Sequence, residues 1–149
     1  MFEIAKLELN HQVEALESTV QDALLQPTRN YVRPLRKIQQ HYKVKNVMHG
    51  IAHITGGGLH ENLGRIMPAG VHATIDKNSW SVPPVFSWLQ ELGEVEEAEM
   101  HRVFNMGIGL VLVVSPYFAN SILTMVQESG LDCWNIGEIH EGGSGVSWS

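Results

Sequence analysis

Residues 49–65 read HGIAHITGGGLHENLGR, and this stretch decides how the rest of the chain is arranged. Before the glycines, apolar and β-branched residues at Val47, Ile51 and Ile54 predict a strand over 47–55. After them, apolar residues recur at helical spacing and predict a helix over 59–67. The stretch is therefore expected to form a strand, a glycine turn and a helix.

The same strand-and-helix alternation continues on both sides of this stretch. Apolar periodicity, prolines near helix starts and glycines after helix ends predict helices over 2–9, 19–26, 31–42, 83–92, 94–104 and 116–130, and strands over 70–76, 106–115 and 133–142. The strand at 106–115 is expected to be buried, because its apolar residues run almost without interruption. The expected class is α/β (α+β), a mixed β-sheet flanked by helices. Residues 1–149 are expected to form a single domain, with a flexible Gly/Ser-rich tail over 141–149.

Composition excludes several broad classes of function. The net charge of −6 disfavours a nucleic-acid-binding protein, so the basic residues between 29 and 45 are interpreted as a local anion site or a solvated helix face. The single cysteine, Cys133, cannot form an internal disulfide. No signal peptide or membrane span is recognisable, so we expect a cytoplasmic protein with no membrane partner.

The histidines and the glycines of the opening stretch indicate different chemistry. On a strand, His49 and His53 would lie roughly 13 Å apart, too far for one metal ion. His60 and Glu61 lack the second histidine that zinc proteases require, so we expect no metal site. The glycine turn at 56–58, by contrast, would leave backbone N–H groups free to hold an anion at a helix start.

Residues beside the turn could assist an anion there, although the glycines could equally serve only to make a tight turn. Thr55 offers a hydroxyl, and Asn62 and Arg65 lie one and two turns into the predicted helix. Arg29, in QPTRN, could provide a fixed guanidinium or could be an exposed capping residue. The alternating glycines of FNMGIG (104–109) could admit a ligand or a tightly packed helix.

Several strings together resemble one known family. LLQPTRNYV, HGIAHITGGGLHENLGRIMP, IDKNSWSVPPVFSWLQELG, EMHRVFNMGIGLVLVV and WNIGEI are similar, in this order and spacing, to the C-terminal half of phosphoribosylformylglycinamidine cyclo-ligases, also called aminoimidazole ribonucleotide synthetases. The resemblance covers roughly residues 1–148. HITGGG followed by EN, and FNMGIG preceded by EMHR, are its most specific combinations.

The resemblance implies an enzyme of purine biosynthesis. Such enzymes use ATP to activate the formyl oxygen of formylglycinamidine ribonucleotide, and an amine of the same molecule then closes the imidazole ring, with release of ADP and phosphate. By resemblance, the turn of Thr55, Gly56, Gly57 and Gly58 would hold the 5′-phosphate of the substrate. Its implied companions are His53, Asn62 and Arg65, with Thr28 and Arg29 lining the same cleft and Asn105 and Gly107 as further candidates. The resemblance assigns no general base.

The chain departs from this family in its extent. Family members are about twice as long and homodimeric, and their first half carries the segments for ATP and Mg²⁺. We therefore expect the chain to be the substrate-binding half, inactive alone, with the N-terminal half as its partner and no ATP or Mg²⁺ bound to this domain by itself. The alternatives are a stand-alone phosphate- or nucleotide-binding module and, more remotely, a metal-dependent hydrolase using His49, His53 and His60.

Overall fold

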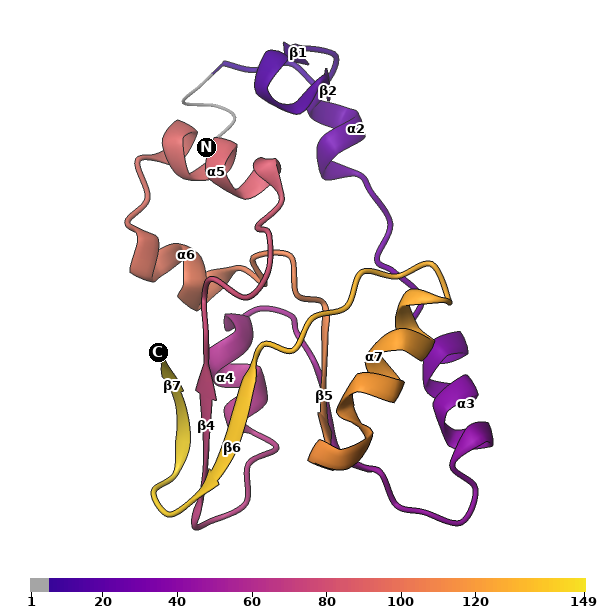
Figure 1. Cartoon of the computed structure of the whole chain (residues 1–149). Coiled ribbons are helices and arrows are strands. Elements are labelled where there is room, and N and C mark those ends of the chain that lie inside the picture. Colours follow the sequence, from indigo (N-terminus) through magenta and orange to yellow (C-terminus); the bar gives the residue numbers. More distant parts are fainter. Residues whose placement is uncertain (1–5) are drawn as a thin grey trace.

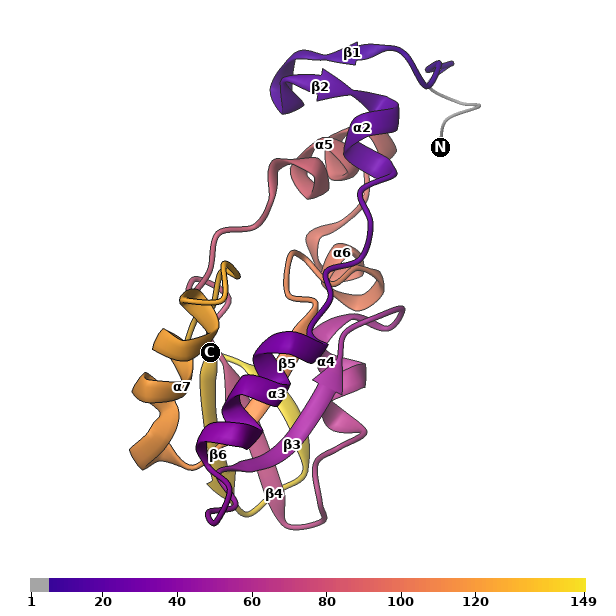
Figure 2. The same cartoon turned by 90° about the vertical axis from the view of Figure 1, so that its right-hand side faces the viewer.

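The glycine stretch forms the predicted strand, turn and helix. The structure is a computed structural model that describes residues 6–149, drawn in two views (Figures 1 and 2). Strand β3 (Met48–His53) leads into the turn, and helix α4 (Gly58–Gly64) leaves it. Strand β3 pairs antiparallel with β5 (Leu110–Val114), and His53 lies opposite Leu110.

A second sheet has three strands and is mixed. Its central strand β4 (Val71–Ile75) pairs antiparallel with β6 (Gly137–Glu141) and parallel with β7 (Gly145–Trp148). A small hairpin near the start of the described chain joins β1 (Gln12–Val13) to β2 (Ser18–Thr19). The predicted class, a mixed α/β fold with flanking helices, is confirmed, although its strands divide into small separate sheets.

The helices begin and end close to where their sequence signals place them. They are α2 (Val20–Leu24), α3 (Val32–His41), α5 (Pro84–Gly93), α6 (Glu97–Val103) and α7 (Ala119–Gln127), with short 3-10 helices at Glu14–Leu16 and Pro116–Phe118. The Thr19 hydroxyl accepts a hydrogen bond from the Asp22 N–H and so caps α2, as its sequence predicts. No helix in the described part of the chain is long and apolar enough to cross a membrane.

Three apolar clusters hold these elements together. The first joins α4 to β3, β4 and β5 through buried Ala52, Leu63 and Ala73. The second packs α3 and α7, which lie side by side in Figures 1 and 2, on the other face of the β3–β5 pair. The third lies between α5 and α6. The first cluster is the one that fixes the glycine turn, because it buries the apolar face of α4.

Three local predictions differ from the structure. The helix predicted over 2–9 falls partly outside the described residues, and residues 6–9 are not helical. Strand β5 is mostly half-buried, with only Val111 fully buried, because it has a single hydrogen-bonded neighbour. The Gly/Ser-rich segment 141–149 carries β7 instead of a flexible tail, because Val146 enters the core and the N–H of Ser149 donates to the Ile75 carbonyl at 2.9 Å.

Candidate functional site: the glycine turn and the surface around it

The glycine turn adopts a backbone that side chains disfavour. Gly57 and Gly58 have φ angles of 95° and 62°, in the left-handed region that glycine enters without strain. The N–H of Gly58 donates to the Thr55 carbonyl at 3.1 Å and closes the turn. The N–H groups of Gly56 and Gly57 make no hydrogen bond within residues 6–149, so both remain available to a ligand.

Asn62 faces inward and holds the turn in shape. Its side chain is only 6% exposed, and it is the one buried polar residue in the described core. Its amide nitrogen donates to the carbonyls of Gly58 (2.7 Å), Gly56 (3.2 Å) and Thr55 (3.3 Å). An amide that already donates to three protein carbonyls has no donor left for a phosphate. Asn62 therefore positions the turn, whereas its sequence position alone suggested a ligand contact.

Arg65 is held by two neighbours on its own helix. Its guanidinium donates to Asn62 Oδ1 at 3.2 Å and to Glu61 Oε1 at 2.8 Å. The Glu61 carboxylate also lies against Gly57, where a Cβ atom would collide with it. Because Glu61 and Arg65 are both more than half exposed, their ion pair is weak and can open in water. Opening it would move a carboxylate away from the turn and free a cation beside it.

The turn is packed against the end of α6 and the segment that follows. A Cβ atom on Gly58 would lie 3.0 Å from the Phe104 carbonyl oxygen and 3.3 Å from that of Arg102. Asn105 comes next, and its Oδ1 accepts a hydrogen bond from the Gly107 N–H at 3.0 Å. Gly107 has a φ of 98° and packs on Pro83. This contact brings the two glycine-rich strings together, while Asn105 and Gly107 themselves shape the loop.

Tyr31 links the PTRNY string to the end of β3. Its ring lies edge-on to His53 with 6.2 Å between centroids, and its hydroxyl reaches the α-carbon of Gly109, where a Cβ atom would collide with it. Burial raises the pKa of Tyr31, and the nearby Arg29 guanidinium opposes this rise. Arg29 is thus close enough to affect the Tyr31 hydroxyl. Thr28 lies on the same exposed connection between α2 and α3.

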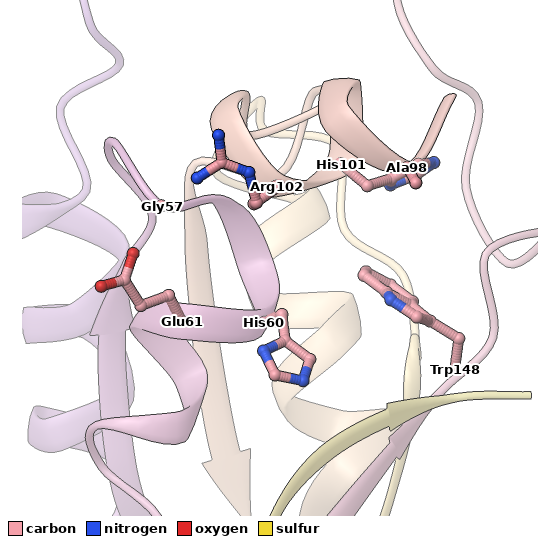
Figure 3. A pocket seen from close by; sticks show the side chains of 7 residues that line it. All are labelled: Gly57, His60, Glu61, Ala98, His101, Arg102 and Trp148. Carbon is pink, nitrogen blue, oxygen red and sulfur yellow. The ribbon is translucent and has the colours of Figure 1, made fainter. Parts of the chain in front are cut away.

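A pocket of about 510 Å³ adjoins the turn, between α4, α6 and the end of β7. Figure 3 shows His60 facing the Trp148 ring, with His101 and Arg102 on the helix above them. Burial lowers the pKa of His101, the positive charge of Lys77 lowers it further, and Glu97 opposes both. The His101 and Trp148 rings meet edge to face at 5.2 Å.

The predicted site residues are thus only partly assembled. Thr55, the three glycines, Asn62 and Arg65 form one connected unit, and His53 lies at its entrance beside Tyr31. Sequence reasoning missed Tyr31, His101, Arg102 and Trp148. Tyr31 had a signal, since it comes two residues after the PTR string, whereas Trp148 lies in a segment whose composition suggested disorder. Among residues 6–149, no three His, Cys, Asp or Glu side chains are grouped so that they could hold a metal ion.

The protein is an α/β domain in which helices flank a mixed sheet. Its glycine turn joins a strand to the start of a helix, so domains of this class can present backbone N–H groups to an anion. The chain belongs within this class to the family described as AIR synthase related protein, C-terminal domain, whose model matches residues 1–149.

Curated relatives carry the name phosphoribosylformylglycinamidine cyclo-ligase. The protein from Geobacillus kaustophilus is 45% identical over 149 residues, which is 100% of this chain and 42% of the relative. The one from Pseudothermotoga lettingae is 43% identical over 96% of this chain and 41% of its own length. The family resemblance inferred from the sequence is confirmed. The chain spans less than half the length of these relatives.

Solved structures share the fold at low sequence identity. A thiamine-monophosphate kinase from Stenotrophomonas maltophilia has a TM-score of 0.66 and 19% identity, covering 99% of this chain and 44% of that protein. The hydrogenase maturation protein HypE from E. coli has a TM-score of 0.61 and 20% identity, over 87% of this chain and 39% of its own. At this identity the likeness establishes the architecture only.

Proposed function

We propose that the chain is the substrate-binding part of a phosphoribosylformylglycinamidine cyclo-ligase. The observation that supports this most is the 45% identity over the whole chain to a curated cyclo-ligase of which it spans 42%. The reaction would convert formylglycinamidine ribonucleotide and ATP to aminoimidazole ribonucleotide, ADP and phosphate, in the cytoplasm. The substrate is the small-molecule partner in this proposal, and neither nucleic acid nor membrane takes part.

The glycine turn would hold the 5′-phosphate of the substrate. The N–H groups of Gly56 and Gly57 supply two donors, and the Thr55 hydroxyl would supply a third by giving up its long 3.4 Å bond to Asn62 Oδ1. Asn62 would keep these donors in place through its bonds to the turn carbonyls. The ion pair between Arg65 and Glu61 would open, so that the guanidinium turns toward the phosphate. Fixing one end of the substrate in this way would present its other end for reaction.

The remaining parts of the enzyme would come from the N-terminal half found in the relatives. ATP supplies the phosphoryl group that activates the formyl oxygen, with Mg²⁺ to neutralise its charge. We assign the metal and ATP to that other half because the family resemblance places the segments for both there. The chain alone would then be inactive. The complete enzyme would be a homodimer.

Joining the chain to the N-terminal part of a relative tests this function. The segment of the Geobacillus kaustophilus relative that precedes the matched 149 residues is fused ahead of this chain, and ADP formation is followed with formylglycinamidine ribonucleotide and ATP. We expect substrate-dependent ADP release from the fusion and none from the chain alone. A folded fusion that releases no ADP above an ATP-only control would contradict the proposal.

A stand-alone phosphate-binding module is the second candidate. It draws on one observation, that the turn and the three side chains bonded around it, Thr55, Asn62 and Arg65, all lie in this chain. Binding of ribose 5-phosphate to the chain alone, together with an inactive fusion, would favour this candidate over the cyclo-ligase.

A further inference from the structure

A second groove lies at the far end of β3 from the glycine turn. It has a volume of about 480 Å³ and is bordered by the end of α3, the loop that follows and the first residues of β3. Ile51 is the lining residue nearest the turn along the chain, and Gly56 follows it five residues later, which is roughly 16 Å at about 3.3 Å per extended residue. The groove is therefore separate from the site already described.

Every residue lining the groove that carries a full charge is a cation. Lys43 and Lys45 line it, His49 lies beside them, and no aspartate or glutamate contributes to its wall. Both lysines are exposed, and neither takes part in an ion pair between residues of the described range 6–149. The chain as a whole is negative, with a net charge of −6, and these two lysines without a carboxylate partner create a positive electrostatic potential in the groove.

The polar wall of the groove is fixed by neighbouring side chains. The Tyr42 hydroxyl bonds to Ser121 Oγ at 2.9 Å, and His49 Nε2 bonds to Ser115 Oγ at 2.8 Å. The Lys45 ammonium lies 5.1 Å from the centre of the Phe118 ring. The groove thus pairs a fixed polar wall with two exposed lysine ammonium groups, one of which lies near an aromatic ring.

The volume and the charge together select the class of ligand. A volume of about 480 Å³ falls within the range of small-molecule sites and exceeds what one inorganic phosphate needs. Nucleic acid fits less well, because the protein carries a net charge of −6. We infer that this groove binds the phosphate group of a phosphorylated small molecule of nucleotide size.

Calorimetric titration of the 149-residue chain with adenosine monophosphate at low ionic strength tests the inference. The double variant K43E/K45E should weaken binding at least tenfold. The matched control is R33E/R36E, which changes the net charge equally at two exposed cations of α3 outside the groove, and it should change binding less than twofold. Circular dichroism of each variant checks that it is folded, and K43Q/K45Q repeats the test without charge reversal.

The outcomes separate this groove from the glycine turn. The same titration of the Gly57→Val chain, in which the proposed phosphate site at the turn is removed, should retain the binding of the groove and its sensitivity to K43E/K45E. If Gly57→Val loses the binding of adenosine monophosphate and K43E/K45E keeps it, the inference is overturned, and the glycine turn is then the site that binds the nucleotide. Equal loss in both charge-reversed variants, no binding at all, or tighter binding of a hexaglutamate peptide would also overturn it.

Discussion

Replacing Asn62 by alanine is the change that tests most sharply how the glycine turn is held. The shortest of its bonds, 2.7 Å to the Gly58 carbonyl, is buried, and water cannot replace it. Losing one such bond costs about 1–1.5 kcal/mol, while the Gly58 carbonyl, as the first of α4, still accepts from the helix backbone. The longer bonds to Thr55 and Gly56 lie nearer the surface, where water can take over. We therefore expect Asn62→Ala to lower the free energy of unfolding by about 1–2 kcal/mol.

Urea unfolding followed by tryptophan fluorescence measures this loss. Asn46→Ala is the matched control, because Asn46 is exposed and its side chain makes no hydrogen bond within the described chain. The control should change the free energy of unfolding by less than about 0.5 kcal/mol. Equal midpoints for the two variants at an unchanged urea slope would refute the role assigned to Asn62.

Three further changes test the turn and its surroundings. Gly58→Ala should destabilise the chain by about 2–4 kcal/mol in urea unfolding, because its Cβ would meet backbone carbonyls, whereas Gly56→Ala, with open space around it, should cost less than about 1 kcal/mol. Burial, followed by the Lys77 charge, lowers the pKa of His101, so the unfolded chain binds the proton more tightly and stability should fall as the pH drops below 6.5. Between a pH above 6.5 and a pH below it, the free energy of unfolding of His101→Gln should fall less than that of the unchanged chain. An equal fall in the two proteins would contradict this reasoning. Val146→Ala should cost about 1.5–2 kcal/mol if β7 is packed as described, and a mobile tail would show no change in the urea midpoint.

Most helices and strands could be predicted because their signals are local. Apolar spacing located β3 and α4, and the cap at Thr19 marked the start of α2. Strand β7 could not be predicted, because it is only four residues long, follows a glycine-rich stretch and owes its place to pairing with β4, about seventy residues earlier in the chain. The division into separate sheets depends on the same kind of distant pairing.

In the candidate site too, features that depend on neighbouring residues could be predicted from the sequence, and features that depend on distant residues could not. The glycine turn was predictable from its composition between a strand and a helix. The inward orientation of Asn62 was not, because it depends on where the turn carbonyls point once Gly57 and Gly58 adopt positive φ. The close approach of Gly58 to the end of α6 joins residues about forty-five positions apart, and no local pattern reports it.

The Michaelis constant of a Gly57→Val variant tests the central claim most directly. In the fusion with the N-terminal half, the KM for formylglycinamidine ribonucleotide should rise at least tenfold, while the KM for ATP should stay unchanged. Gly70→Val is the matched control, because Gly70 also has a positive φ (80°) but lies outside the turn. A rise in the ribonucleotide KM confined to Gly57→Val is the predicted result. Identical kinetic constants for the two variants would contradict the assignment of the glycine turn to the substrate phosphate.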